Sequence, residues 1–339
     1  MAGLWVYQRI IRKLQWLMAA AVIWFAVAFI LESAAAQTRN ANRAHCKDTN
    51  PDLSVEGCTA LIQSGHENTS RLTEAFSDRG NAYFRKGDYD RAIQDYDQAI
   101  QLKPDSAQVF NNRGNAFTRK GRLDRAIEDY DQATKLRPDY ALAFNNRGIV
   151  YDRMGEYNRA IQDYDQAIRL KADFAEAFNN RGISFDNEGD YDHAIRDFIQ
   201  AIRLKPDFAM AFNNRGIAYN DKCQYDRAIQ DFDQAIALKP DHPQAFNDRG
   251  AAYFGKHLYD RAIQDYNEAI RLKPDYAEAF NNRGNAYDRI GEHDRAILDY
   301  DQAMTLKPDF SEARTNRANA YTRKTESDGT NPTLSSSKF

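Results

Sequence analysis

The stretch TEAFSDRGNAYFRKGDYDRAIQDYDQAIQLKPDS, residues 73–106, is the unit from which most of this chain is built. Its arginine–glycine pair recurs every 34 residues, at Arg79-Gly80, Arg113-Gly114, Arg147-Gly148, Arg181-Gly182, Arg215-Gly216, Arg249-Gly250 and Arg283-Gly284, with a degenerate copy at Arg317-Ala318. A fixed period in the thirties indicates stacked supersecondary units rather than one globular core. The chain is therefore expected to present an extended surface that holds a partner.

Each unit is predicted to be a pair of short helices. Phe76, Gly80 and Tyr83 share one face of a first helix, because they are spaced by four and three residues. The same spacing recurs in a second helix, at Ala92, Tyr96 and Ala99. Gly87 interrupts the chain between the helices, and Pro104 ends the second one. Neither helix can bury its apolar stripe alone, so neighbouring units must stack.

Three positions of the unit carry more specific expectations. Gly80 is expected where the two helices approach most closely, because a glycine inside a helix costs about 1 kcal/mol and needs a packing reason. Arg79 is expected to pair with Asp95 of the following helix, and its copies with Asp129, Asp163 and onward; the alternative is a role in ligand binding. Short polar residues where the second helices begin are expected to cap free backbone amides and to suit the helix dipole, at Asp90, Asp124, Asn158, Asp192, Asp226, Asp260 and Asp294.

Over about residues 73–324 the chain resembles the tetratricopeptide-repeat family. The residues that match the family pattern are Gly80, Tyr83, Gly87, Tyr89, Ala92, Tyr96, Ala99 and Pro104, together with their copies. The resemblance implies an all-α fold, a right-handed α-solenoid of about seven helix–turn–helix repeats that start at residues 73, 107, 141, 175, 209, 243 and 277. A half repeat at 311–324 then forms a polar capping helix. The departures are Ala172 for the terminal proline, Cys223 and His257 for the interhelix glycine, and arginine where the family often has leucine.

Residues 1–36 differ from the repeats and are typical of a secretory signal peptide. Arg9, Arg12 and Lys13 precede an apolar run from residue 16 to 31, and three alanines at 34–36 provide a small-residue cleavage site. The alternative is an uncleaved signal anchor, since residues 14–31 are just long enough to span a bilayer. Either way the repeats are expected to be exported across the inner membrane, to the periplasm or beyond.

Residues 37–72 are aperiodic and are expected to cap the first repeat. A helix is predicted from about Ser54 to Ser64, with Gly65 as its stop. Export favours a disulfide between Cys46 and Cys58, which would contribute on the order of 2–3 kcal/mol. Cys223 is left as a free thiol, and no recognisable metal-ligand set is present. At the other end, residues 325–339 are small and polar and are predicted to be a disordered tail.

The sixth position of each unit, counted from residue 73, is the candidate binding surface. First helices of such a solenoid line its concave side, and the sixth residues do not belong to the packing stripe. They are Asp78, Asn112, Asn146, Asn180, Asn214, Asp248, Asn282 and Asn316. Because an amide both donates and accepts, a row of asparagines could hold an extended peptide by its backbone. This is similar to the asparagine ladder of the O-linked N-acetylglucosamine transferase family. The alternatives are copying of a neutral residue by duplication, a local cap and a solvated face.

Other modes of action are less well supported by the sequence. A carboxylate clamp needs basic residues on neighbouring first helices, and the second residues of the units are not basic: Glu74, Gln108, Leu142, Glu176 and Met210. The formal net charge of −3 does not suit a nucleic-acid binder. The six histidines are scattered, and neither a nucleophile motif nor a phosphate-binding loop is present, so no catalysis and no cofactor are expected. The sequence thus predicts a module that binds a protein or peptide, with a self-associating scaffold as the alternative.

Overall fold

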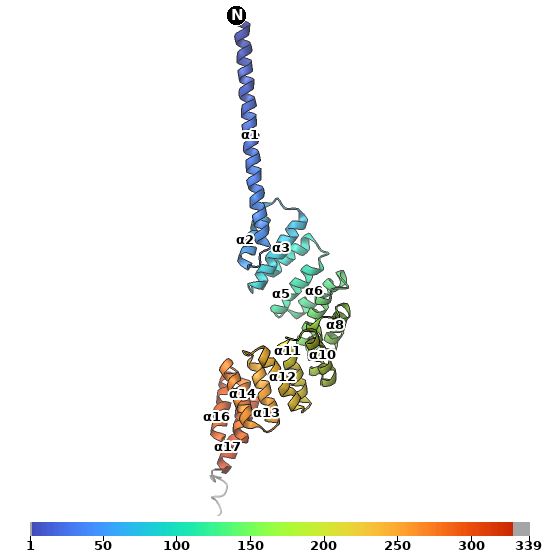
Figure 1. The fold of residues 1–339 in the computed structure, drawn as a ribbon, viewed down its shortest axis with the longest axis vertical. Helices are drawn as coiled ribbons and strands as arrows, with labels where there is room; N and C mark the ends of the chain where they lie inside the picture. Colours follow the sequence, from blue (N-terminus) through green and yellow to red (C-terminus); the bar gives the residue numbers. More distant parts are fainter. Residues whose placement is uncertain (1, 328–339) are drawn as a thin grey trace, which may run out of the picture. The chain divides into compact units, whose positions relative to one another are not determined.

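The computed structural model describes the backbone of residues 2–327 and the side chains of residues 16–327, and this part of the chain is entirely helical (Figure 1). The predicted all-α solenoid of helix–turn–helix repeats is confirmed. The helices are α1 Ala2–Cys46, α2 Pro51–Ser64, α3 Thr69–Arg85, α4 Tyr89–Leu102, α5 Ala107–Arg119, α6 Leu123–Leu136, α7 Ala141–Arg153, α8 Tyr157–Leu170, α9 Ala175–Asn187, α10 Tyr191–Leu204, α11 Ala209–Asp221, α12 Tyr225–Leu238, α13 Pro243–Gly255, α14 Tyr259–Leu272, α15 Ala277–Arg289, α16 His293–Leu306 and α17 Ser311–Ser327.

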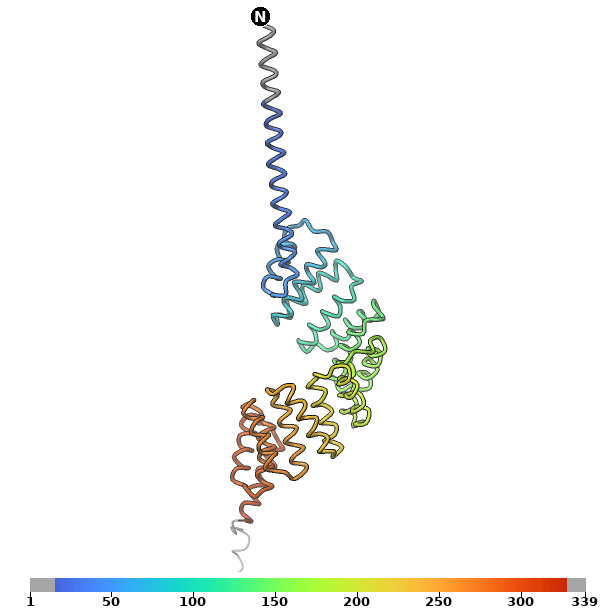
Figure 2. Tube along the Cα trace, in the orientation of Figure 1, coloured from blue at the N-terminus to red at the C-terminus, as the bar shows by residue number. Residues whose placement is uncertain are grey.

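Two compact units divide the chain, Met1–Val150 and Tyr151–Phe339. Within each unit, helical hairpins follow one another along the chain and pack on their neighbours (Figure 2). We call the odd-numbered helices from α3 to α17 the first helices and their even-numbered partners the second helices. Helix α17 extends to Ser327, so residues 325–327 of the predicted tail are helical. The rest of that tail, residues 328–339, lies outside the described residues.

In α3, α5, α9, α11, α13 and α15, the glycine of the arginine–glycine pair lies against the aromatic ring of the second helix that follows. A Cβ atom added at Gly80 would lie 2.7 Å from Cε1 of Tyr96, and one added at Gly182 would lie 2.7 Å from Cε1 of Phe198. Tyr96 and Phe198 are fully buried. The packing reason predicted for these glycines is therefore confirmed, and it makes the helix pair the rigid unit of the fold.

The arginine beside this glycine joins the two helices of its repeat through a two-pronged ion pair. Arg79 donates from Nε and Nη2 to the two carboxylate oxygens of Asp95, each at 2.8 Å. Equivalent pairs join Arg113 to Asp129, Arg181 to Asp197, Arg215 to Asp231, Arg249 to Asp265 and Arg283 to Asp299. The acids are buried, so each charge is compensated inside the repeat. The predicted pairing of Arg79 with Asp95 is confirmed.

The prediction that Asp90 and its equivalents cap the second helices is wrong. Helix α4 begins at Tyr89, and its N-cap is Asp88, whose side chain accepts from the amide of Arg91. Asp90 lies in the first turn instead, where its charge suits the helix dipole. Its carboxylate forms an ion pair with Lys120 of the next repeat. The same link joins Asp192 to Lys222, Asp226 to Lys256 and Asp294 to Lys324.

Two turns between helices place a non-glycine residue in the left-handed region. Cys223 has φ 58° and His257 has φ 61°, where the other repeats have glycine, for example Gly189 at φ 81°. Residues with a Cβ atom avoid this region because the side chain crowds the following carbonyl. These substitutions, noted in the sequence, therefore leave two strained turns in the second unit.

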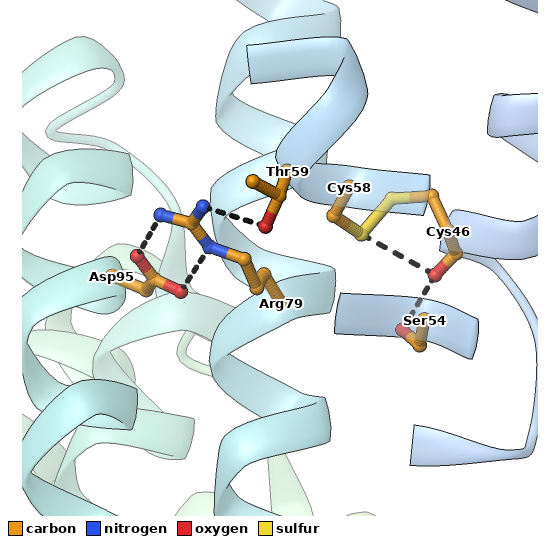
Figure 3. The surroundings of a disulfide bond; sticks show 6 residues. All are labelled: Cys46, Ser54, Cys58, Thr59, Arg79 and Asp95. Carbon is orange, nitrogen blue, oxygen red and sulfur yellow. Dashed lines mark hydrogen bonds and ion pairs between the residues drawn. A yellow bond between two sulfur atoms is a disulfide. The ribbon is translucent and has the colours of Figure 1, made fainter. Parts of the chain in front are cut away.

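Residues 37–72, which we call the cap, contact the first repeat much as one repeat contacts the next. Arg79 donates from Nη1 to Thr59 of α2 at 3.0 Å (Figure 3), as Arg113 donates to Asp97 of α4. Lys86 pairs with Asp52, as Lys120 pairs with Asp90. Each cap residue lies 38 residues before its counterpart. In that register Cys58 takes the place of the buried Tyr96. A disulfide joins Cys58 to Cys46 at the end of α1. The bond thus holds α1 and α2 together at the position where a true repeat has its buried aromatic ring.

Helix α2 itself begins and ends with clear signals. Asn50 caps it by accepting from the amide of Asp52, and Pro51 occupies the first turn. Gly65 ends it in the left-handed region, at φ 65°, as the sequence predicts. Helix α1 continues from the apolar N-terminal run into the cap without a break. Its described part includes a stretch that is long and apolar enough to cross a membrane, by length and composition.

Candidate functional site

The sixth residues of the repeats lie on the first helices, as the sequence places them, and all of them are partly exposed. Each is preceded by a fifth residue that is buried in most repeats; Asn111 and Asn281 are each 1% exposed. The fifth and sixth side chains of a repeat therefore differ in environment. The fifth belongs to the interior, and the sixth lies at the boundary between the interior and the surface.

Asparagine amides link several of the first helices to the next first helix in the same unit. Asn146 of α7 donates from Nδ2 to Oδ1 of the buried Asn111 in α5, at 3.0 Å. The same bond, from a sixth residue to the fifth residue of the preceding repeat, joins Asn214 to Asn179 and Asn282 to Asn247 at 3.0 Å, and Asn316 to Asn281 at 3.1 Å. The first repeat has no asparagine at its fifth position, so Asn112 of the second repeat donates instead to Asn81 of the first repeat, at 3.0 Å. We call these bonds the amide links.

The amide links were missed by reasoning from sequence. They give the asparagines a structural role, because a buried carbonyl such as that of Asn111 needs a donor. The signal was present in the recurring Asn-Asn pair, but the partner lies 35 residues away and is found only once the stacking register is known. One N–H of a sixth-position amide satisfies the link. A primary amide has a second N–H and a carbonyl with two acceptor sites, so groups remain that can meet a ligand.

Asp248 breaks this pattern in the second unit. A carboxylate cannot donate, so the direction of the hydrogen bond is reversed at this junction. The buried Asn213, 4% exposed, donates from Nδ2 to Oδ2 of Asp248 at 3.1 Å. Oδ1 of Asn213 is then buried without a partner among the described residues. Burial raises the pKa of Asp248 to about 6, against the hydrogen bonds from Asn213 and Asn247, and the charge of Asp221 adds to the rise.

Asp78, the sixth residue of the first repeat, lies beside the cap. Burial raises its pKa, while Lys47 and Arg85 act in the opposite direction. A surface cavity of about 290 Å³ opens here, lined by Cys46, Lys47, Asp48, Ser54, Glu74, Asp78, Asn81 and Arg85. The charges in this cavity are mixed, so it offers no single sign of potential to a ligand.

The second residues of two repeats are acids that already have partners. Glu176 pairs with Lys205, and Glu278 pairs with Lys307, each at 3.2 Å. The first helices therefore present no ring of cations at this position, in keeping with the sequence-based view of the carboxylate clamp. Within the described chain, no group of three or more His, Cys, Asp and Glu residues is arranged to hold a metal ion.

Comparisons with known proteins identify the repeat. The family model "Tetratricopeptide repeat" matches residues 141–174, 175–208, 209–242 and 277–310. A second model, "TPR repeat", matches residues 80–121, 114–155 and 259–291. Together they cover more than half of the chain. Such repeats generally mediate protein–protein interactions and are typically not catalytic. No curated protein matches the sequence.

Solved structures share the fold at low sequence identity. The APC/C heterotetramer Cut9–Hcn1 matches with a TM-score of 0.63 and 17% identity, over 79% of this chain and 52% of that chain, so this chain spans about half of its length. A tetratricopeptide repeat protein from Parabacteroides merdae matches at 0.61 and 21%, over 74% and 99% of the two chains. PilF of Pseudomonas aeruginosa matches at 0.55 and 19%, over 63% and 97%. From its repeats and from the family models that match them, this chain belongs to the tetratricopeptide-repeat family.

Proposed function

We propose that this chain is a non-catalytic module that binds an extended segment of a protein partner along its first helices, through the sixth-position residues. One observation carries the proposal. The amide links hold Asn112, Asn146, Asn214, Asn282 and Asn316 in a repeated orientation at the surface, each with one N–H used. A fixed amide loses little rotamer freedom when it binds, so the ordering cost of association is reduced.

The chemistry of the amide suits a peptide backbone better than a particular side chain. An amide can donate to a carbonyl and accept from an N–H of the same extended chain. Repetition along the first helices then lets several weak contacts add along one partner segment. Asn180 and the acids Asp78 and Asp248 belong to the same surface and complete the proposed site. Selectivity for particular residues must come from positions that differ between repeats.

We also propose that the repeats act outside the cytoplasm. Two features support export: the apolar N-terminal helix, and the disulfide between Cys46 and Cys58, a bond that persists in oxidising compartments. A cleaved signal would release the repeats, and an uncleaved one would tether them to the membrane through α1. N-terminal sequencing of the protein recovered from cells separates the two outcomes, because cleavage at the alanines would leave a chain that begins near Gln37.

The binding proposal is tested with two matched sets of variants of the second unit. The first set, N214A/N282A/N316A, removes the surface amides. The second, N179A/N247A/N281A, removes their buried partners. Both sets break the same three amide links, but only the first removes groups that would face a peptide. The probe is a pool of dye-labelled ten-residue peptides, acetylated and amidated, with mixed uncharged residues, and binding is read by fluorescence anisotropy.

Wild type and the buried set are expected to bind the pool, and the surface set to bind it several-fold more weakly. The surface set leaves buried carbonyls without a donor, at about 1–3 kcal/mol each, and the buried set removes those carbonyls but leaves space in the interior, so both sets are first checked for folding by circular dichroism. Equal loss of binding in the two sets would show that the asparagines act through stability alone. Absence of binding by wild type, together with concentration-dependent self-association in sedimentation, would favour the scaffold instead.

A further inference from the structure

Two junctions between first helices of the second unit differ in charge. The α15–α17 junction has an ion pair, and the α9–α11 junction has two carboxylates at the equivalent positions. At the C-terminal end, Asp288 of α15 pairs with Arg323 of α17, which lies 35 residues later, and accepts a 2.7 Å bond from His293. The equivalent residues of α9 and α11 are Asp186 and Asp221, also 35 residues apart. Two carboxylates thus take the places of a carboxylate and a guanidinium.

Asp186 and Asp221 are close enough for their charges to interact, and neither forms an ion pair with a cation among the described residues. Burial raises the pKa of Asp186 to about 6, and the charge of Asp221 adds to the rise. Burial also raises the pKa of Asp221. Asp248 of α13 is a third acid at this place, because the charge of Asp221 also raises the pKa of Asp248. First helices α9, α11 and α13 contact one another in turn, so the three acids lie on neighbouring helices of one unit.

Three buried acceptor atoms beside these acids have no partner among the described residues. They are Oδ1 of Asp186, Oδ1 of Asn220 and Oδ1 of Asn213. Asn213 is the clearest case, because it is only 4% exposed and its amide lies against Asp248. A buried acceptor without a donor costs about 1–3 kcal/mol. Excess negative charge and missing donors are therefore found at the same place.

The sequence removes cations from this part of the surface. The last residue of the first helices is arginine at Arg119, Arg153 and Arg289, but the three repeats between them have Asn187, Asp221 and Gly255 there. The cluster is thus left uncompensated by the chain itself, whereas every buried acid of the repeat ion pairs described above has its own arginine. We call Asp186, Asp221 and Asp248, with Asn213 and Asn220, the acidic cluster.

We propose that the acidic cluster is a specificity subsite of the first-helix surface that receives a lysine or arginine side chain of the bound partner. The inference rests on the proposed function, since it assigns a side-chain preference to the same first-helix surface. An ammonium or guanidinium group brings both a positive charge and several N–H donors, which the acids and the unpartnered carbonyls lack. A metal ion suits the cluster less well, because the acids of the described chain do not converge with metal-ligand spacing.

The test uses three versions of the peptide pool described above, with the central residue fixed as lysine, glutamine or glutamate. Wild type is expected to bind the lysine pool about tenfold more tightly than the glutamine pool at low ionic strength, as for a charge-assisted hydrogen bond. The glutamate pool is expected to bind most weakly. Added salt should reduce the differences, because a partly exposed charge pair is screened.

The variant D186N/D221N/D248N keeps the shape of the cluster and removes its charge. It is expected to lose the preference for lysine, measured within the variant as the ratio of its affinities for the lysine and glutamine pools, so that a change common to both pools does not enter the comparison. The matched control is D139N/D207N/D275N, which neutralises three exposed acids in the loops between repeats and changes the net charge equally. The control should keep the full preference, so a general charge effect is separated from a local one.

The outcomes distinguish the inference from the proposed function. If wild type binds no pool, the first-helix surface does not hold peptides, and both ideas fail. If wild type binds all three pools equally, or if the preference for lysine survives in D186N/D221N/D248N, the surface holds peptides but the acidic cluster is not a subsite for a cation. A third result is that wild type binds calcium ions in isothermal titration calorimetry, loses that binding in the same variant and shows no preference among the pools. That result would overturn the inference and show that the acidic cluster binds a metal ion.

Discussion

Replacing Asp248 by asparagine should stabilise the protein at neutral pH. The change restores the residue type found at this position in most repeats. The amide introduced there could donate to Oδ1 of Asn213, as Asn214 donates to Asn179, and a desolvated charge would be lost. Function and stability therefore oppose each other at this site, because the carboxylate proposed to select a cationic partner costs folding free energy when no partner is bound.

The size of the effect follows from the pKa of Asp248, which rises from 3.8 to about 6 on folding. At about 1.4 kcal/mol for each pH unit, the difference sets an upper limit of about 3 kcal/mol for the cost of ionising this group in the folded state. The side chain is partly exposed, and water screens part of that cost. We therefore expect a gain of about 1–2 kcal/mol for Asp248→Asn at pH 7.5.

The pH dependence of the stability difference between wild type and Asp248→Asn shows whether ionisation of Asp248 causes it. A carboxyl whose pKa is raised by folding binds its proton more tightly in the folded state, so it opposes folding only where the unfolded chain is ionised. The cost is absent below about pH 4, grows as the pH rises toward 6, and is constant above. Urea unfolding of wild type and Asp248→Asn at pH 4, 5, 6 and 7.5, followed by circular dichroism, measures this difference. A variant less stable than wild type at pH 7.5, or a difference that does not grow between pH 4 and 6, would refute the reasoning.

Three further predictions concern packing, backbone strain and the cap. Gly182→Leu should lower the free energy of unfolding by about 1–3 kcal/mol or more, since even a Cβ atom would lie 2.7 Å from Phe198; an unchanged melting temperature would contradict the close helix approach. Cys223→Gly should raise stability by about 1 kcal/mol in urea unfolding, because glycine adopts φ 58° without crowding, and a loss of stability would show that the thiol packs favourably. Reduction by dithiothreitol should lower stability by about 2–3 kcal/mol through the bond between Cys46 and Cys58, whereas C46S/C58S should not respond to the reductant; equal responses would assign the effect elsewhere.

The repeat interior could be predicted from sequence because its contacts lie within one period. Arg79 and Asp95 are 16 residues apart in the same helix pair, and Gly80 faces Tyr96 at the same separation. Such contacts follow once two amphipathic helices and a turn are recognised. The error at Asp90 has a similar local cause. The second helix begins at Tyr89, so Asp88 rather than Asp90 holds the cap position, a shift that spacing alone does not resolve.

The candidate site was only partly predictable, because its chemistry depends on contacts between repeats. The sixth positions were placed correctly on the first helices, yet the partner of Asn146 is Asn111, and this pairing requires the stacking register. The acidic cluster needs that register as well, since Asp186 and Asp221 meet only when consecutive repeats are aligned. Sequence composition gave no sign of it, because acids and arginines are numerous in every repeat.

The cap that imitates a repeat has a consequence for how the chain acquires its structure. In a solenoid each unit is stabilised by its immediate neighbour, so order can spread from any unit that is already formed. The cap precedes every repeat along the chain, and its two helices are held together by a covalent bond rather than by an aromatic core. Oxidation of Cys46 and Cys58 would therefore give the first repeat a finished surface to fold against. Without the bond, we expect fraying to begin at α3 and to leave the C-terminal repeats protected in hydrogen exchange.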